Sequence, residues 1–262
     1  MDTGHPLSAR PVPAGDVDYE ATGSGYAANR RPDPRIAAMI HTALGDARTV
    51  LNVGAGTGSY EPSDREVVAV EPSAQMRAQR PPGSAPAVDA TAEDLPFANR
   101  AFDAVMAIVT IHQWRDWKRG LRELRRVSSG PVVVVTFDPE LVAAWWLAEY
   151  LPGLFRAEAT RYPPIDAICD VLGPRTTAVP VPIPIDCTDG FTEAFYGRPE
   201  AFLNPEVRAA QSAWQFADPA EAATGLSRLS ADLSSGRWDA RHGYLRTRQE
   251  FVGAVRLIVG LP

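Results

Sequence analysis

Apolar residues recur along the chain with two different periods, and these periods predict where strands and helices lie. Five short apolar runs are typical of buried strands, at residues 49–53, 67–70, 85–88, 102–109 and 132–137. Between the last two runs, Trp117, Leu121 and Leu124 share one face of a predicted helix. An earlier helix begins after Asp33, an N-cap followed by proline, and ends at Gly45. Short strands that alternate with helices predict a parallel sheet covered on both faces.

After residue 138 this alternation stops. Residues 139–150 predict an amphipathic or buried helix, and two or three further helical segments follow between 191 and 233. Residues 179–185 alternate proline with branched residues, which favours an edge strand or an extended linker over a central strand. Residues 251–259 predict a last strand. We therefore expect a flexible tail over 1–18, an α/β core over 19–138, a helical lid insertion over 139–248 with an edge strand near 175–185, and a final core strand over 249–262.

Composition narrows the classes of partner. A formal net charge of −6 without a dense Lys/Arg run argues against nucleic acid and anionic membranes as partners. No apolar run approaches the roughly twenty residues that a membrane-spanning helix needs. The two cysteines, Cys169 and Cys187, lie far apart without metal-binding spacing, which is typical of reduced thiols in the cytoplasm. We expect a cytoplasmic protein, monomer or homodimer, that acts on a small molecule without a metal.

A glycine-rich turn follows the first predicted strand, in V-L-N-V-G-A-G-T-G-S over residues 50–59. Glycines at 54, 56 and 58 let the backbone turn tightly and approach a ligand closely, because no Cβ stands in the way. The dinucleotide fingerprint G-x-G-x-x-G would need its third glycine or alanine at position 59, which is Ser59. The spacing therefore argues against a nicotinamide cofactor.

Glu71 ends the second predicted strand, in V-V-A-V-E-P-S over residues 67–73. A carboxylate at this edge of a sheet can accept hydrogen bonds from both hydroxyls of a ribose. Two further segments follow: A-T-A-E-D-L-P-F over residues 90–97 with F-D at 102–103, and I-H-Q-W over residues 111–114.

In combination, V-G-A-G-T-G, V-E-P-S, A-E-D-L-P-F with its F-D, and I-H-Q-W resemble the class I S-adenosylmethionine-dependent methyltransferases of the ubiquinone-biosynthesis-like, small-molecule group, over about residues 20–138. The resemblance implies a Rossmann-like α/β fold with seven strands, mostly parallel with the last strand antiparallel, under a helical lid. It implies S-adenosylmethionine as cofactor and S-adenosylhomocysteine as product. The cofactor site that it implies consists of Tyr26, Arg31, Asn52, Gly54, Ala55, Gly56, Gly58, Glu71, Pro72, Met76, Thr91, Ala92, Glu93 and Val109.

Two of these positions depart from the family pattern. Asn52 stands where an acid usually helps to hold the ammonium group of the cofactor, so the acceptor is kept and the charge is lost. Thr91 stands where Asp commonly contacts the adenine amine, and nearby Asp89 is an alternative. Tyr26 and Arg31 precede the first helix, where similar proteins fold a Tyr and an Arg-Pro pair over the cofactor; solvated surface side chains are the alternative.

His112 is the candidate catalytic residue, because a neutral imidazole is suited to taking a proton from a hydroxyl or an amine. The alternative is that His112 caps a helix or packs against Trp114, and many methyltransferases work mainly by proximity and desolvation. The lid is rich in aromatic residues, which indicates an apolar or aromatic acceptor. Its expected contacts are His112, Trp145, Trp146, Phe191, Tyr196 and Arg198.

The resemblance thus predicts methyl transfer to O, N or C of a small organic acceptor, of the kind found in secondary metabolism. Two other functions stay open at this point. A protein of this fold could use the bound cofactor for a cyclisation or rearrangement without methyl transfer, or could be a non-catalytic binding protein. Methyl transfer adds about one CH₂ to the mass of the acceptor, whereas cyclisation or rearrangement adds nothing. Failure to bind the cofactor would favour a non-catalytic binding protein.

Overall fold

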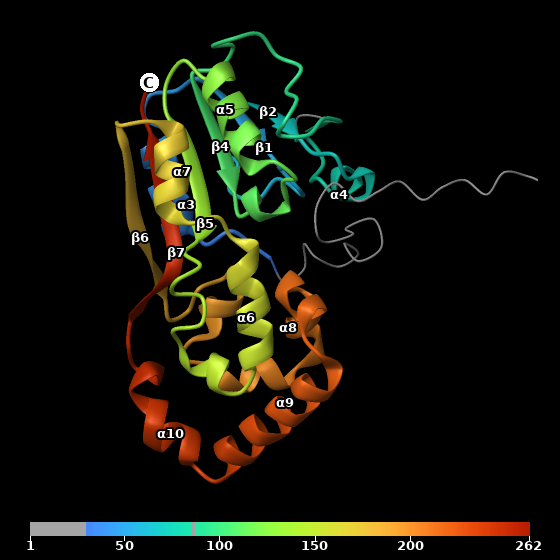
Figure 1. The fold of residues 1–262 in the computed structure, drawn as a ribbon, viewed down its shortest axis with the longest axis vertical. Coiled ribbons are helices and arrows are strands. Elements are labelled where there is room, and N and C mark those ends of the chain that lie inside the picture. Colours follow the sequence, from blue (N-terminus) through green and yellow to red (C-terminus); the bar gives the residue numbers. More distant parts are fainter. Residues whose placement is uncertain (1–29, 85–86) are drawn as a thin grey trace, which may run out of the picture.

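A computed structural model describes residues 30–84 and 87–262, and its centre is a seven-stranded sheet (Figure 1). The strand order is β3-β2-β1-β4-β5-β7-β6, and β7 is antiparallel to both of its neighbours. This confirms the predicted mostly parallel sheet with a reversed last strand. The strands are β1 (Thr49–Val53), β2 (Glu66–Val70), β3 (Ala87–Val88), β4 (Ala104–Ile108), β5 (Val132–Phe137), β6 (Thr176–Pro184) and β7 (Glu250–Gly260).

The sheet is covered on both faces, because successive side chains of a strand point to opposite sides. In β4, Ala104 and Met106 belong to one hydrophobic cluster, whereas Val105 and Ala107 belong to the other. The first cluster includes residues of α3, and the second includes residues of α5 and α7. These sheet-covering helices and the short α4 are α3 (Pro34–Ala43), α4 (Ala74–Ala78), α5 (Trp117–Val127) and α7 (Ile165–Leu172).

The expected insertion over residues 139–248 divides in the structure. Helix α7 packs against α5, and β6 pairs with β7 at the edge of the sheet, so both belong to the core layers. The remainder, residues 138–164 and 185–249, forms a separate helical layer that we call the cap. In Figure 1, α6, α8, α9 and α10 of the cap lie together beyond the ends of the strands. The cap elements are η2 (Trp146–Glu149), α6 (Pro152–Arg161), η3 (Thr192–Phe195), η4 (Pro199–Leu203), α8 (Pro205–Ala209), η5 (Ser212–Phe216), α9 (Pro219–Ser234), α10 (Arg237–His242) and η6 (Gly243–Arg246).

The predicted helix over residues 139–150 does not form. This stretch makes turns and the short 3₁₀ helix η2, preceded by Trp145 in an extended conformation with φ −140° and ψ 169°. The extended residue lets two adjacent indoles reach different partners. Trp145 packs against Phe155, while Trp146 packs against Trp238. Tertiary burial of both rings therefore overrides the local helical pattern.

The cap sits at the carboxyl ends of the parallel strands, because β5 and β6 both lead into it and β7 returns from it. This is the edge at which open α/β sheets bind ligands. Within residues 30–84 and 87–262, no helix combines the length and apolar character needed to cross a membrane.

Candidate functional site

The glycine turn after β1 requires glycine at several positions. Gly54, Gly56 and Gly58 have φ values of 68°, 51° and 94°, a region that favours glycine strongly. A Cβ on Gly54 would also lie only 2.1 Å from Oγ1 of Thr110. The turn is thus packed directly against the segment that follows β4.

Glu71 lies beside this turn, at the carboxyl end of β2. Its side chain is buried, with Oε2 accepting the backbone N–H of Gly56 and Oε1 accepting that of Ser73, both at 2.8 Å. Burial raises the pKa of Glu71 above its ordinary value, and the two N–H donors oppose this shift. An ionised carboxylate has about four acceptor positions, so two remain for ribose hydroxyls. Met76 is buried beneath the turn, and its Cε would lie 3.3 Å from a Cβ on Gly56.

Asn52 is joined to a carboxylate that sequence reasoning missed. Its amide Nδ2 donates to Oε1 of Glu61 at 2.9 Å, and Arg80 forms a bidentate ion pair with the same carboxylate, at 3.0 and 2.9 Å. Oδ1 of Asn52 is buried and has no hydrogen-bond partner in the described part of the chain. Glu61 therefore places a carboxylate next to position 52, where the family usually has an acid, and Arg80 balances its charge. The only feature of the sequence that could have indicated this contact is the position of Glu61 directly after the glycine turn, in S-Y-E-P over residues 59–62.

The segment expected to line the adenine lies between β3 and β4. Ala92 is buried and Thr91 is exposed. Glu93 accepts the backbone N–H of Asp116 at 3.1 Å, close to the start of α5, and Asp89 forms an ion pair with Arg77 at 3.0 Å. Both acids thus have structural partners. Two other residues expected at the cofactor lie nearby. Ala55 lies within the glycine turn and is buried, and Pro72 follows Glu71 and is half-buried.

The segment after β4 combines strain with an unusual histidine. Val109 has φ 51°, a conformation that a β-branched residue rarely adopts and that is typical of functional sites. His112 follows in η1 (Ile111–Gln113), with its ring centroid 4.9 Å from that of Tyr162. Burial, together with the charges of Arg161 and Arg30, holds the pKa of His112 well below its ordinary value. The imidazole is therefore neutral at physiological pH.

A cavity opens between this segment and the cap, and we call it the acceptor cavity. Its free space, counted together with the open solvent at its mouth, is about 640 Å³. Aromatic rings from β5, α6 and the cap loops make up much of its wall. The lining residues are Arg30, Val109, His112, Phe137, Val142, Trp145, Phe155, Glu158, Tyr162, Phe191, Thr192, Glu193, Gln211, Ser212 and Ala213.

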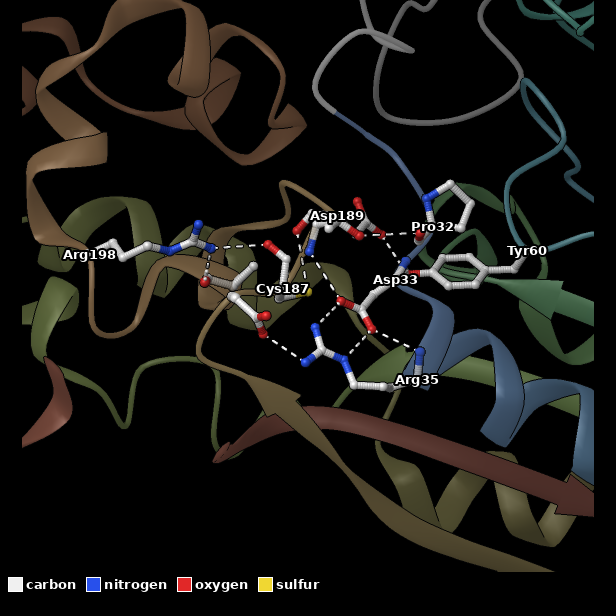
Figure 2. Close-up of polar contacts among 10 residues, drawn as sticks. Pro32, Asp33, Arg35, Tyr60, Cys187, Asp189 and Arg198 are labelled. Atoms are coloured by element: carbon white, nitrogen blue, oxygen red, sulfur yellow. Dashed lines mark hydrogen bonds and ion pairs between the residues drawn. The ribbon is translucent and has the colours of Figure 1, made fainter. Parts of the chain in front are cut away.

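Of the residues expected to bind substrate, His112, Trp145 and Phe191 line this cavity, and three do not. Trp146 donates its indole N–H to the carbonyl of Tyr196 at 2.8 Å. The hydroxyl of Tyr196 in turn donates to the carbonyl of Arg248 at 2.6 Å. Arg198 donates to the carbonyls of Cys187 and Ala194 (Figure 2). These three side chains hold the cap together.

The segment before α3 contacts the cap through Arg30. Tyr26 lies outside the described residues, and Arg31 is exposed. Arg30 instead turns inward and donates from Nε to Oδ1 of Asp189 at 2.6 Å. Oδ2 of Asp189 accepts a hydrogen bond from the hydroxyl of Tyr60 at 2.9 Å (Figure 2). Tyr60 lies two residues after Gly58, the last glycine of the turn. Asp189 thus joins the glycine turn, the segment before α3 and the cap.

Asp33 is a second carboxylate of this region, fully buried at the start of α3 (Figure 2). It accepts hydrogen bonds from the backbone N–H and guanidinium of Arg35 and from the backbone N–H of Thr188. The side-chain hydrogen bond from Arg35 lowers the pKa of Asp33 from 3.8 to about 2, against the effect of burial. A depressed carboxyl pKa stabilises the fold above the unfolded value, and this contribution is lost as pH falls through the folded value.

We expect Asp33→Asn to lower the free energy of unfolding by about 2 kcal/mol at neutral pH, and by nearly nothing once the pH is below the folded pKa of Asp33. Asparagine keeps the N-cap acceptor, so the helix start should survive. Urea unfolding at neutral and strongly acidic pH measures both values. Asp46→Asn, at an exposed position beyond the other end of α3, is the control and should change neither. An equal loss at both pH values would contradict the assignment.

Comparisons with known proteins agree with this geometry. The methyltransferase domain family matches residues 51–145. The crystal structure of a candidate methyltransferase from an antibiotic biosynthesis pathway of Anabaena variabilis superposes with a TM-score of 0.82 at 32% identity, covering 88% of this chain and 98% of that protein. YcgJ of Bacillus subtilis shares the fold, with a TM-score of 0.50 at 18% identity, covering 87% of this chain and 97% of that protein. No curated protein sequence matches the chain.

The similarity extends beyond the domain that carries the glycine turn, because the Anabaena protein aligns over most of the chain, cap included. With the seven-stranded sheet, the glycine turn and Glu71 at the end of β2, it establishes both the fold and the cofactor. The chain belongs to the class I S-adenosylmethionine-dependent methyltransferases and is an enzyme that uses S-adenosylmethionine as its methyl donor.

Proposed function

We propose that the enzyme methylates an O, N or C atom of a small, apolar or aromatic organic molecule that binds in the acceptor cavity. The observation that carries this proposal is the shared segment after β4. Thr110 packs against Gly54 of the glycine turn, while its neighbours Val109 and His112 line the cavity. The cofactor site and the acceptor site would therefore meet at this segment, which brings the two reactants together.

His112 is the proposed proton acceptor. When bound, S-adenosylmethionine supplies an electrophilic methyl group. A hydroxyl or amine acceptor loses a proton as its new bond to carbon forms, and a neutral imidazole in the cavity wall can take that proton. The low pKa of His112 keeps the base form present at neutral pH. The aromatic wall and the cap over it would exclude water, which strengthens electrostatic interactions at the reacting atoms.

The relative from Anabaena variabilis comes from an antibiotic biosynthesis pathway, which favours a role in secondary metabolism for this enzyme too. A cytoplasmic location and a small-molecule acceptor are part of the same proposal, because the net charge of −6 favours neither nucleic acid nor membrane surfaces.

The test is incubation with S-adenosylmethionine and a panel of small aromatic hydroxyl, amine and carbon acceptors, followed by mass spectrometry. We expect one or more acceptors to gain the mass of a CH₂ group, with an equal amount of S-adenosylhomocysteine formed. For a hydroxyl or amine acceptor, we expect His112→Gln to slow this reaction on the order of a hundredfold, the usual contribution of a general base.

His242→Gln is the matched control, because His242 lies in the cap and does not line the cavity. Calorimetric titration with S-adenosylhomocysteine should show equal affinity in both variants. A full rate in His112→Gln would remove the general base and leave proximity as the source of catalysis. A product of unchanged mass, formed without consumption of the cofactor, would instead support cyclisation or rearrangement.

A further inference from the structure

Three buried polar atoms without a hydrogen-bond partner among the described residues belong to side chains that line the acceptor cavity. They are Nε1 of Trp145, Nε2 of Gln211 and Nδ1 of His112. Trp145 is 8% exposed and Gln211 is 3% exposed, so solvent does not readily satisfy these groups. Leaving a buried polar group without a hydrogen-bond partner destabilises a protein, and folded proteins contain few such groups. Other buried atoms of the described residues also lack a partner, but these three belong to residues of one cavity, where a ligand would supply the missing partners.

The contacts of Gln211 determine which of its amide atoms lacks a partner. Its Oε1 accepts from the hydroxyl of Thr192 at 3.0 Å and from Nε1 of Trp214 at 3.1 Å. An indole N–H can only donate, so the atom that faces Trp214 has to be the amide oxygen. The amide orientation follows, and the NH₂ group of Gln211 is left as a donor.

Trp145 adds a second donor of the same kind, because its indole nitrogen also has no acceptor capacity. Its ring is held edge-on against Phe155, with the centroids 5.8 Å apart. Two N–H donors without a partner on residues of the wall favour a ligand with hydrogen-bond acceptors, and oxygen atoms are the usual ones. The rings of Phe137, Tyr162 and Phe191 provide the complementary surface for a flat, apolar body.

The charged side chains of the cavity wall are paired within the protein. Arg30 pairs with Asp189, and Glu158 pairs with Arg161. Glu193 accepts the backbone N–H of Ala254, and burial raises the pKa of Glu193 to about 7. An anionic ligand would thus be buried beside carboxyl groups, and burying a charge without compensation is costly. The wall favours a neutral ligand.

We propose that the methyl acceptor is a neutral aromatic compound with at least one carbonyl or hydroxyl oxygen, which accepts hydrogen bonds from Nε1 of Trp145 and Nε2 of Gln211. This inference rests on the proposed function and specifies its substrate class. Nδ1 of His112 lies in the same wall, where an acceptor hydroxyl would give it a partner and bring the proton to be removed within reach.

The test uses three probes that share one ring system and differ in one substituent: the ketone acetylnaphthalene, the hydrocarbon ethylnaphthalene and the carboxylate naphthoate. Their affinities for the enzyme saturated with S-adenosylhomocysteine are measured by calorimetry and by quenching of tryptophan fluorescence. We expect the ketone to bind about tenfold more tightly than the hydrocarbon, as one or two hydrogen bonds to buried donors would give. The carboxylate should bind more weakly than the ketone.

Variants locate the donors. Trp145→Phe keeps an aromatic ring, smaller than the indole, and removes the N–H. Gln211→Glu keeps an oxygen for Thr192 and Trp214 and removes the NH₂ group. We expect the preference for the ketone over the hydrocarbon to fall in both variants. Trp238→Phe is the matched control, because Nε1 of Trp238 is also buried without a partner in the described part of the chain but belongs to the cap interior. A ratio of affinities cancels any general loss of stability, so the control should retain the full preference.

Equal affinity for ketone and hydrocarbon in the wild type, tightest binding of the carboxylate, or an unchanged ratio in both cavity variants would each overturn the inference. Methylation of an acceptor that lacks an aromatic ring would also overturn the inference. That result would leave the proposed methyl transfer to a small molecule intact. Failure of the wild-type enzyme to bind S-adenosylhomocysteine would overturn the proposed function and this inference with it.

Discussion

Replacing Glu71 with alanine is expected to weaken the affinity for S-adenosylhomocysteine by about a thousandfold, or about 4 kcal/mol. The carboxylate lies between the glycine turn and the start of α4, where it accepts the N–H groups of Gly56 and Ser73. Its remaining acceptor positions would bind the ribose hydroxyls, and a hydrogen bond to a charged group contributes about 1.5–3 kcal/mol. Alanine removes these bonds and the anchor of the turn together. Calorimetric titration measures the change directly.

The control for this prediction comes from the same strand. Glu66 begins β2 at its exposed end, so Glu66→Ala should leave the affinity unchanged. Glu71→Gln keeps one oxygen acceptor without the charge and should fall between wild type and alanine. An affinity in Glu71→Ala within a few-fold of the wild type would show that the ribose is held elsewhere.

The parts of the fold that sequence patterns predicted correctly are those with local physical causes. The strand over Thr49–Val53 is rich in branched apolar residues because it is buried on both faces, and the glycines after it are needed for φ values of 68°, 51° and 94°. Asp33 caps α3 through a bond to Arg35, only two residues away. Each of these signals lies within a few residues, so a pattern along the chain reveals it.

The parts that could not be predicted depend on distant partners. Arg30 turns inward to pair with Asp189, about 160 positions later, and lines the acceptor cavity, whereas Arg31, which we expected at the cofactor, is exposed. Glu61 joins Asn52 only because the turn folds back and Arg80 closes on it. Trp145 and Gln211 line one cavity although they come from loops far apart in the chain. A pattern of residue spacings along the chain cannot predict contacts between residues so far apart in the sequence.

Asp189 is the distant partner with the largest expected effect on stability. Its side chain is 5% exposed, that of Arg30 is 13% exposed, and the hydroxyl of Tyr60 reaches the second carboxylate oxygen. Burial and the Asp189 carboxylate raise the pKa of Tyr60 well above its ordinary value, so the phenol stays a neutral donor. Breaking a buried ion pair from one side is much more costly than losing an exposed one, because the other charge stays desolvated.

We therefore expect Asp189→Ala to lower the free energy of unfolding by about 3–5 kcal/mol, measured by urea unfolding at neutral pH. Asp186→Ala is the matched control. Asp186 lies in the same loop and pairs with Arg35, but its side chain is 73% exposed, so its removal should leave the midpoint unchanged. Equal effects in the two variants would show that the ion pair of Arg30 with Asp189 is no more important than a surface contact. A large loss in Asp189→Ala alone would show that one carboxylate ties the cap to the glycine turn, so that the acceptor cavity depends on the same bond as the cofactor site.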